Sequence, residues 1–554
     1  MEEREFNLLD EPWVCAISPG CAMREVSLTD ALLQAHMFAD LSGEMAAQDI
    51  AVLRLMLAVL HAVFSRVDAE GREAPLKTPD DALQRWKSLR DLGRFPEGPI
   101  RAYLEKWHER FYLFHPERPF YQVVVAASGS EYQASKLNGE LSESNHKLKL
   151  FSLRAGSFKE ELTYPEAARW LLYLNAFDDN SLKSEQSKSH APGRPYNVEA
   201  KISDEEKSSA PGAGWLGKLG LIQAVGSNLF ETLLLNLTLL FDGSTLWEEK
   251  ECPIWELENA REAERTEISL PRNCAGLLTL QSRRILLKRA PDRVTGYTVL
   301  GGDFFPKENA FAEQMTLWRE SEDKQTKQIA FVPWRHDKSR QIWREFSAIA
   351  AEKESQRAPG LVKWLERLQK QKLLEKNRMI HLRTVAVQYG SSDYMAEDSF
   401  SDSLSLHSNL LSEAGRGWQK RIEEQLQKID ETAKAYSYFT IDLAKASGRS
   451  ENDFKALQSA AKKRWYGRVD LSFRAWLAGV DAEQDNDEID DLQLQWQNQA
   501  RRLAMDLADA DVLEAGDAAF VGRTLEEKKK TAHYSAPEAY RYFRNAVYKI
   551  YPHA

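Results

Sequence analysis

Apolar and polar residues alternate with a helical period over much of the first 240 residues. The stretch DIAVLRLMLAVLHAVF, inside a helical region from about residue 29 to 66, is almost entirely apolar, which predicts a helix buried at the centre of the protein. Further helices are expected over about 79–114, with a break near LGRFPEGP, and over 165–177 and 221–241. The first 20 residues suggest strands, with a buried set of Phe6, Leu8, Leu9, Trp13 and Val14.

Strand-like runs separated by turns fill the middle of the chain. AGLLTLQSRRILLKR, RVTGYTVLGGDFF and the later LRTVAVQYG at 382–390 have the composition of β-strands. Two segments, 126–160 and 178–215, are rich in polar residues and helix breakers and are expected to form long loops. The middle of the chain therefore adds sheet to a largely helical first part.

The chain changes character from about residue 401. Four helical stretches, about 410–447, 451–480, 487–514 and 531–550, are separated by short polar connections, which predicts an antiparallel four-helix bundle. The expected fold class is α+β, with a mixed α/β domain over residues 1–400 and the bundle over 401–554.

Composition narrows the class of protein. The 554 residues, 43% of them hydrophobic, are enough for two to four globular domains, and no apolar run is long enough to predict a membrane span. The four cysteines form no C-x-x-C pair, which fits a reduced, cytoplasmic protein. Because the net charge is −10, any contact with nucleic acid is expected through local basic loops inside a larger assembly.

The segment PGAGWLGKLG at 211–220 matches two phosphate-binding patterns. Gly212, Gly214 and Gly217 fit G-x-G-x-x-G, and Gly212, Gly217 and Lys218 fit G-x-x-x-x-G-K. Leu219 stands where a magnesium-binding hydroxyl is needed, and no apolar strand precedes the segment, so a P-loop-like nucleotide hydrolase is only the alternative. Two interpretations stay open: a surface loop that caps the following helix, or bare main chain that approaches a ligand closely, with Lys218 near a phosphate.

Catalytic motifs are missing from the sequence. The eleven histidines are dispersed, there is no H-E-x-x-H or G-x-S-x-G motif, and the neighbours His336 and Asp337 lack further ligands at helical spacing. We therefore expect no enzymatic activity, no metal and no cofactor.

Two longer motifs carry a resemblance to a known family. FNLLDEPWV at 6–14 and FYLFHPERPFYQV at 111–123, followed by the glycine segment and a helical C-terminal part, resemble the CasA family, the large subunit of the type I-E Cascade complex of CRISPR immunity. The resemblance implies a non-catalytic subunit that recognises the protospacer-adjacent motif in double-stranded DNA, promotes duplex opening and R-loop formation, and recruits a helicase-nuclease. Its implied partners are the other Cascade subunits, the 5′ handle of the guide RNA and the target DNA, with no membrane.

The resemblance also implies roles for individual residues. The glycine segment would read the minor groove, whose degenerate hydrogen-bond pattern suits tolerant recognition, through Gly212, Gly214, Trp215, Gly217 and Lys218. A basic finger would place Arg265 in the same groove. A wedge that starts strand separation would consist of Ser391, Ser392, Asp393 and Tyr394, although the polar amides of the family's wedge are absent here. The guide RNA would be held by Asn145, His146, Lys147 and Lys149, with Arg154 nearby.

Three further clusters of basic residues allow two interpretations, phosphate contact or a solvated surface, and the second is more common for charged helices. They are Arg283, Arg284, Lys288, Arg289 and Arg293; Lys363, Arg367, Lys370, Lys372, Lys376, Arg378 and Arg383; and Lys462, Lys463, Arg464 and Arg468.

Overall fold

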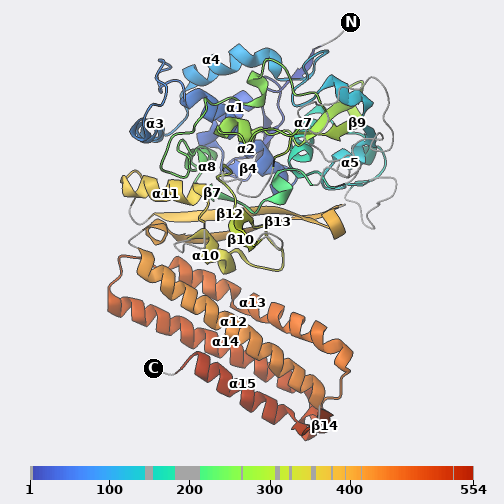
Figure 1. Cartoon of the computed structure of the whole chain (residues 1–554), viewed down its shortest axis with the longest axis vertical. Coiled ribbons are helices and arrows are strands. Elements are labelled where there is room, and N and C mark those ends of the chain that lie inside the picture. The colour runs from blue at the N-terminus through green and yellow to red at the C-terminus, as the bar shows by residue number, and fades with distance from the viewer. Residues whose placement is uncertain are drawn as a thin grey trace. The chain divides into compact units, whose positions relative to one another are not determined.

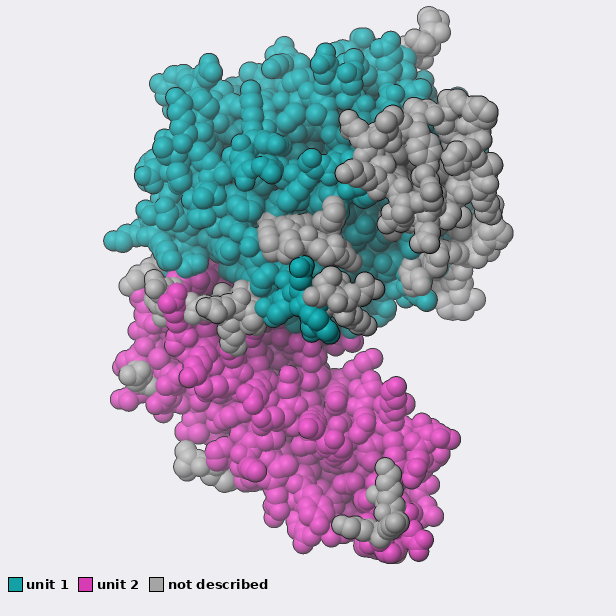
Figure 2. All heavy atoms as spheres, in the orientation of Figure 1, with its two compact units in different colours: residues 1–338, 351–373, 381–403 teal, residues 339–350, 374–380, 404–554 magenta. Residues whose placement is uncertain are grey.

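The chain folds into two compact units that mix helix and sheet. The computed structural model describes residues 4–143, 154–180, 213–263, 266–305, 312–322, 327–350, 357–375, 378–393, 395–412, 415–527 and 530–552. Unit 1 comprises residues 1–338, 351–373 and 381–403, and unit 2 comprises residues 339–350, 374–380 and 404–554 (Figures 1 and 2). Unit 2 thus takes two short segments from the part of the chain that was expected to form one N-terminal domain.

The core of unit 1 is built around α2 (Ala46–Phe64). The helix packs against α4 (Glu97–Trp107), α7 (Tyr164–Phe177), α8 (Leu229–Asn236) and α9 (Cys274–Leu278) (Figure 1). Contrary to the expectation that no apolar run is long enough to span a membrane, this helix is long and apolar enough to do so, but 94% of its apolar stretch is buried inside the protein. Burial on all sides explains why polar residues are so rare in it, and it confirms the central helix expected from the sequence.

The helices around α2 begin and end at the signals visible in the sequence. Thr78 caps α3 (Pro79–Leu92), and its side chain and that of Asp81 each accept a hydrogen bond from the other's backbone N–H. Gly93, with φ +65°, ends α3, and Pro96 precedes α4, so the predicted break at LGRFPEGP is confirmed. Thr163 caps α7 in the same way as Thr78 caps α3. A short helix, α1 (Leu28–Leu33), precedes them.

Small antiparallel sheets complete unit 1. β2 (Val14–Ile17) lies between β3 (Met23–Val26) and β4 (Asp40–Leu41), and β1 (Glu5–Asn7) pairs with β5 (Tyr112–Phe114). β9 (Arg293–Gly301) lies between β6 (Ser130–Gln133) and β8 (Arg283–Ala290), and β10 (Trp318–Glu322) pairs with β11 (Ile329–Pro333). The strands expected around residues 283–301 are confirmed, but the residues AGLL before them belong to α9.

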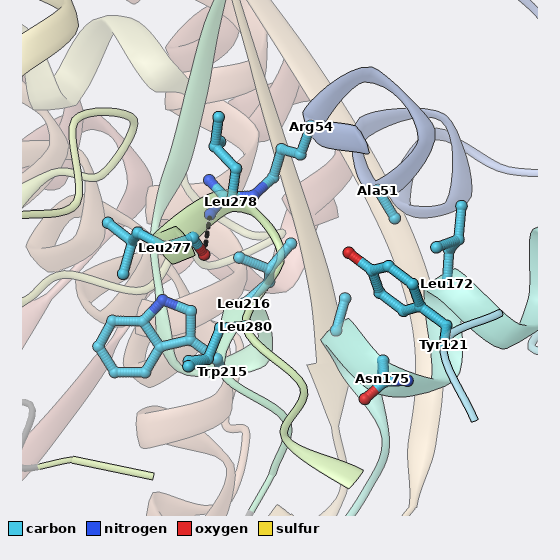
Figure 3. Close-up of a pocket in the computed structure, with 11 residues that line it drawn as sticks. Ala51, Arg54, Tyr121, Leu172, Asn175, Trp215, Leu216, Leu277, Leu278 and Leu280 are labelled. Carbon is cyan, nitrogen blue, oxygen red and sulfur yellow. Dashed lines mark hydrogen bonds between the residues drawn. The ribbon is translucent and has the colours of Figure 1, made fainter. Parts of the chain in front are cut away.

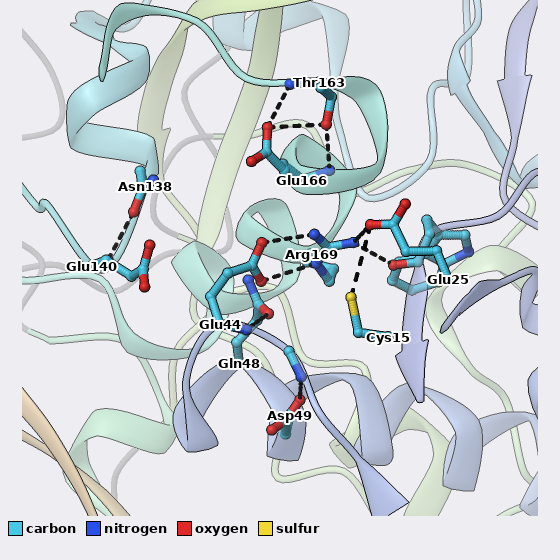
Figure 4. Close-up of polar contacts among 12 residues, drawn as sticks. Cys15, Glu25, Glu44, Gln48, Asp49, Asn138, Glu140, Thr163, Glu166 and Arg169 are labelled. Carbon is cyan, nitrogen blue, oxygen red and sulfur yellow. Dashed lines mark hydrogen bonds and ion pairs between the residues drawn. The ribbon is translucent and has the colours of Figure 1, made fainter. Parts of the chain in front are cut away.

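A buried arginine joins the N-terminal strands to α7. The Arg169 guanidinium donates from Nε and Nη2 to the two carboxylate oxygens of Glu44, at 3.0 and 2.7 Å (Figure 4). Its Nη1 donates to Glu25 at 2.8 Å and to the backbone oxygen of Trp13 at 2.7 Å. The N-terminal motif FNLLDEPWV is therefore held in the core by its tryptophan and by this charged network.

Two sequence expectations in unit 1 are wrong. Residues 221–241 do not start as a helix: β7 (Leu221–Val225) pairs antiparallel with β12 (Met379–Tyr389), and α8 begins only after the Asn228 cap. Because β7 is buried on both faces, its apolar run carries no strand period that would distinguish it from a helix. Within 126–160, β6, α5 (Ala134–Leu137) and α6 (Ser157–Glu160) replace part of the expected loop.

Unit 2 contains four long helices that pack on one another. α12 (Arg416–Ala446) contacts α13 (Phe454–Ala478), α14 (Asn486–Val521) and α15 (Ala536–Ile550), and α14 also contacts both of the others. Stacked and edge-on rings of Phe473, Trp476 and Trp496 fill the space between α13 and α14. The sequence predicted that this helix would end near residue 514, but α14 extends to Val521. It continues past a break at Gly516 and leads into a hairpin of β14 (Arg523–Glu527) and β15 (Lys530–Tyr534).

Candidate nucleic-acid interface

The described part of the glycine segment, residues 213–220, is packed inside unit 1. The backbone N–H of Gly214 donates to the backbone oxygen of Asp178 at 2.8 Å. A β-carbon at Gly214 would stand 2.4 Å from the backbone oxygen of Ala176. A β-carbon at Gly220 would stand 1.8 Å from the Trp334 oxygen. The expectation of bare main chain at Gly214, open to a DNA groove, is therefore wrong. Glycine is required here because backbone segments of the same protein approach each other closely.

Trp215 is also an internal residue. Only 5% of it is exposed, its ring centroid lies 4.5 Å from that of Phe305, and its backbone N–H donates to Ser282 Oγ at 2.9 Å. Trp215 lines a cavity of about 30 Å³ that Arg54, Tyr121, Asn175 and Leu277 also line (Figure 3). This volume suits a few water-sized molecules and is far too small for a nucleobase. Stacking of Trp215 on DNA would require the core to open.

The same surroundings argue against the nucleotide-hydrolase alternative. A P-loop runs from a strand through the glycine loop to a helix N-terminus, whose N–H groups hold the phosphates. Here Lys218 ends a short turn of Leu216–Lys218, and the next element is the strand β7. The helix that such a loop needs is therefore not the element that follows it.

The structure brings the glycine segment next to the predicted wedge. Gly217 lies against Tyr389, the last residue of β12, so that a β-carbon at residue 217 would stand 2.1 Å from Tyr389 Oη. Shortly after Tyr389, the turn Ser391–Asp393 begins. The backbone oxygen of Asp393 accepts a hydrogen bond at 2.7 Å from the backbone N–H of Asn180, which follows the end of α7. The end of α7 thus contacts both elements, although 170 or more residues separate them in the chain.

An ion pair holds the wedge turn. Arg335 donates from Nη1 and Nη2 to the two carboxylate oxygens of Asp393, each at 3.0 Å, and its guanidinium lies over the Tyr389 ring, 5.6 Å from the centroid. Asp393 has φ +59°, a conformation that non-glycine residues seldom adopt. The pair therefore stabilises a strained turn. Sequence analysis missed Arg335 and Tyr389. Tyr389 lies inside the strand predicted at 382–390, and Arg335 precedes the pair His336–Asp337, but neither residue was assigned a role.

Some of the other predicted site residues lie within the described part of the chain, and the rest do not. Lys218 is half-buried at the end of the glycine segment, and Ser391 is exposed. Arg154 forms ion pairs with Glu166 at 2.9 Å and with Glu140 at 3.6 Å, so part of its charge is already balanced within the protein. The remaining candidates lie outside the described residues or, for Ser392, have no described side chain: Gly212, Arg265, Tyr394, Asn145, His146, Lys147 and Lys149.

Two of the five residues of the first basic cluster, Arg283 and Arg284, are internal, whereas Arg289 and Arg293 are exposed. Arg283 donates to Asp178 Oδ2 at 2.6 Å, and Arg284 donates to Asp303 Oδ1 at 2.5 Å; all four side chains are at most 2% exposed. Neither phosphate contact nor a solvated surface describes these two arginines. The sequence places the acids far from the arginines, so the pairing could not be recognised before the chain folded.

Several residues of the other two clusters form ion pairs with acids of the same protein. Lys363 lies 3.3 Å from Asp242, and Lys370 lies 2.9 Å from Glu366 one helical turn away. Arg464 pairs with Asp511, and Arg468 lies 3.7 Å from Asp506. These contacts favour the solvated-surface interpretation for the residues concerned.

Within the described part of the chain, no group of three or more histidine, cysteine, aspartate or glutamate side chains could hold a metal ion. His336 is half-buried and donates to the Leu221 oxygen at 2.9 Å, and desolvation lowers its pKa to about 4, so it is neutral near pH 7. Cys15, Cys21, Cys252 and Cys274 are free thiols.

Comparison with known proteins identifies the family to which the chain belongs. Residues 7–507 match the family model described as CRISPR-associated protein Cse1. The chain belongs to the Cse1 family. A curated relative, the CRISPR-associated protein CasA/Cse1 of Thermus thermophilus, is 35% identical over 262 residues, which are 46% of this chain and 45% of the relative. The aligned part thus spans about half the length of that relative.

Solved structures extend the similarity to the whole fold of the Cse1 chain. The crystal structure of Thermobifida fusca Cse1 covers 99% of this chain and 98% of its own length, with a TM-score of 0.80 and 28% identity. A chain of a structure described as a CRISPR RNA-guided surveillance complex covers 98% of this Cse1 chain and 99% of its own length, with a TM-score of 0.65. At 18% identity, the second match shows a shared fold.

Proposed function

We propose that this Cse1 chain is the non-catalytic large subunit of a type I-E Cascade complex in the cytoplasm. It recognises the protospacer-adjacent motif in double-stranded DNA, promotes duplex opening and R-loop formation, and recruits the helicase-nuclease. Its partners are the other Cascade subunits, the 5′ handle of the guide RNA and the target DNA. Family membership supports this proposal, and so does the fold shared with a chain of an RNA-guided surveillance complex.

One observation carries the proposal at the level of residues: the end of α7 contacts both the glycine segment and the wedge turn. The Gly214 N–H donates to the backbone oxygen of Asp178 at 2.8 Å, and the Asn180 N–H donates to the backbone oxygen of Asp393 at 2.7 Å. A displacement of one element is therefore transmitted to the other through two residues of backbone. In this proposal the buried glycines do not touch DNA. They support Lys218 and the turn Ser391–Asp393, which face the duplex.

The Arg335–Asp393 pair gives the proposed opening step a defined component. A carboxylate repels the DNA backbone, but in the ion pair its charge is balanced by Arg335 through two parallel hydrogen bonds. Holding the turn in its strained conformation before DNA arrives lowers the ordering cost of inserting it between strands. Loss of the pair is therefore expected to impair opening more than initial binding.

The proposal is tested with the reassembled complex on duplexes with and without a proper motif. Lys218→Ala is expected to weaken binding to motif-bearing duplex several-fold, with a correspondingly lower salt dependence if it contacts a phosphate. Asp393→Asn is expected to slow strand separation, followed by fluorescence of a base analogue next to the motif, while initial binding is retained.

Asp398→Asn is the matched control for the opening step. Asp398 lies on β13 (Ala396–His407), is 55% exposed, and lies 3.9 Å from Lys338, so its removal disturbs only a weak surface pair. Equal opening rates for native protein, Asp393→Asn and Asp398→Asn would contradict the role of the turn. A complex that binds both duplexes equally well in all forms would contradict motif recognition by this subunit.

A further inference from the structure

The motif FYLFHPERPFYQV forms one wall of a small pocket in unit 1. This aromatic-turn pocket has a volume of about 40 Å³, and Arg110, Arg118, Trp255 and Gln281 contribute to its lining. Phe120, one of the three phenylalanines of the motif, also lines the pocket and is 3% exposed. The pocket is distinct from the glycine segment and the wedge turn, and nothing in the proposed function uses it.

The two arginines of the pocket lack a carboxylate partner. Among the described residues, no ion pair is formed by Arg110 or by Arg118; Arg110 donates only to the backbone oxygen of Leu257, at 3.2 Å. Burial lowers the pKa of Arg110, and the positive charge of Arg118 lowers it further. Two neighbouring guanidinium groups that form no ion pair within the described chain are unfavourable in a partly buried site, and a bound anion would relieve both costs.

Gln281 provides an independent sign of a ligand. It is 6% exposed, and within the described chain its side-chain amide has no hydrogen-bond partner. Gln122, in the same wall, is fully used: its oxygen accepts from Leu287 N–H at 2.9 Å, and its nitrogen donates to the Leu113 oxygen at 2.7 Å. The indole N–H of Trp255 is also used, by Tyr103 Oη at 2.8 Å. Gln281 is therefore the buried polar group that faces the pocket without a partner.

The motif builds the pocket through a local turn. Nδ1 of His115 accepts hydrogen bonds from the backbone N–H groups of Glu117 and Arg118, at 3.1 and 3.0 Å. These bonds fix the backbone where the Arg118 side chain leaves it. Pro119 follows and is buried, so the turn is anchored on both sides of Arg118.

The charges around the pocket favour a single carboxylate over a phosphate backbone. Glu117 and Glu262 line the same pocket, and both are exposed. A nucleic-acid strand carries a phosphate at every nucleotide, so neighbouring phosphates would meet these carboxylates. One carboxylate on a protein surface avoids this repulsion, is matched in shape by a guanidinium, and is small enough for the pocket.

We propose that the aromatic-turn pocket binds one carboxylate, from an aspartate, a glutamate or a chain terminus of a neighbouring protein subunit, through Arg110, Arg118 and Gln281. The anion site itself is independent of the proposed function. Only the identification of the carrier as another subunit of the same complex rests on it.

The anion site is tested on the isolated full-length chain, with acetate as the probe. Thermal unfolding is compared in sodium acetate and sodium chloride at equal ionic strength and pH. Acetate is expected to raise the Tm of the native protein by about 1–2 °C, because a ligand that binds only the folded state stabilises it. The increase is expected to disappear in Arg118→Gln and in Gln281→Leu, and to persist in Arg72→Gln. Arg72 is 74% exposed and lies in the same unit.

Either of two results would overturn the site: no acetate-specific increase in the native protein, or the same increase in Arg118→Gln as in Arg72→Gln. Gln281→Leu changes a buried residue and could unfold the protein. The result for Arg118→Gln, a change at an exposed residue, therefore decides the test. The far-ultraviolet circular dichroism of each variant confirms that it is folded.

The source of the anion is tested by binding to the remaining complex and to duplex DNA. If a protein carboxylate occupies the pocket, Arg118→Gln is expected to weaken association with the other subunits about tenfold, a difference typical of one charged contact. Binding to duplex should then keep its salt slope. If Arg118→Gln instead reduces the magnitude of the slope of log K against log salt by about 1, the pocket binds a phosphate and the proposal is overturned. Unchanged association with the subunits would also overturn it, whatever the outcome for motif recognition.

Discussion

Gly217 and Tyr389 are in direct contact, although Gly217 precedes β7 and Tyr389 is the last residue of β12. A β-carbon at residue 217 would stand 2.1 Å from Tyr389 Oη, and that hydroxyl donates to the Phe177 oxygen at 2.6 Å. Burial raises the pKa of Tyr389 well above its usual value, so the hydroxyl stays protonated and able to donate. The glycine thus makes room for a hydrogen bond that ties β12 to the end of α7.

Gly217→Ala is expected to destabilise unit 1 by about 1–3 kcal/mol, because the added methyl group displaces the Tyr389 ring from its hydrogen bond. Gly214→Ala should cost at least as much, since its β-carbon meets backbone at Ala176, which cannot rotate away. Urea unfolding measures both. Gly98→Ala is the control, because open space surrounds that position in α4. Equal stability of Gly217→Ala and Gly98→Ala would contradict the packing role.

A buried ion pair joins α2 to the segment before β10. Arg54 donates to both carboxylate oxygens of Glu313, at 2.9 and 3.0 Å, and the two side chains are 2% and 1% exposed. Glu313→Gln leaves a buried guanidinium without counter-charge and is expected to cost about 3–5 kcal/mol. The surface change Glu97→Gln, which removes a pair with Arg101, should cost at most about 1 kcal/mol.

A double variant separates the charge from the packing. Arg54→Met with Glu313→Leu removes both charges, and it should recover most of the stability lost in Glu313→Gln, measured by the same urea unfolding. If the double variant is less stable than the single one, the pair contributes net stability and the argument from unpaired charge is wrong.

Asp49 makes stability depend on pH in a specified direction. Burial raises its pKa to about 7, and the charges of Asp40 and Glu44 add to the shift, while the Gly43 N–H and Arg383 act against it (Figure 4). The folded protein therefore keeps a proton that the unfolded chain releases near pH 4. The stabilisation from this group is full below about pH 4 and is lost as the pH rises to about 7.

Asp49→Asn removes this titration and can still accept the hydrogen bond of Gly43 N–H, 2.7 Å long in the native protein. We expect the Tm of the variant to change less steeply between pH 4 and 7 than that of the native protein. Asp80→Asn, a change of an exposed carboxylate in the same unit, should leave the native slope intact. Parallel curves for native protein and Asp49→Asn would refute the assignment.

Asp511 links three helices of unit 2. It accepts a hydrogen bond at 2.6 Å from Tyr436 Oη on α12, pairs with Arg464 on α13, and is 9% exposed. Asp511→Ala leaves both partners unsatisfied and is expected to cost about 2–3 kcal/mol. Asp506→Ala, on the same helix, removes a half-exposed pair 3.7 Å from Arg468 and should change stability by no more than about 0.5 kcal/mol. Calorimetry of the full chain measures both.

The sequence was most informative where structure is local. The break near Gly93 and the all-apolar helix α2 were each predicted from residues within a few turns of one another. The family motifs at 6–14 and 111–123 were recognisable as well, and the Cse1 family assignment agrees with them. Their physical roles, however, lie in contacts across long sequence distances: Trp13 with Arg169, and Arg118 near Arg110 and Gln281.

The candidate site was predictable only in part. That the glycine segment is special was visible, but whether its main chain is bare or buried depends on Ala176, Tyr389 and Trp334, which no local pattern connects to it. In the same way, Arg283 and Arg284 counted as basic residues in the sequence, and their acids reach them only in the folded chain.

By itself, the sequence determined most of the long helices, the strands around 283–301 and 382–390, the family and the presence of an unusual glycine segment. Those properties depend on neighbouring residues, since capping, periodicity and backbone freedom act over a few residues. The tertiary structure alone decided that the glycines serve internal packing, that Arg335 holds Asp393, and that Arg110 and Arg118, which form no ion pair within the described chain, line one pocket with Gln281. Burial and charge pairing depend on which distant segments meet, and that is settled only when the whole core is assembled.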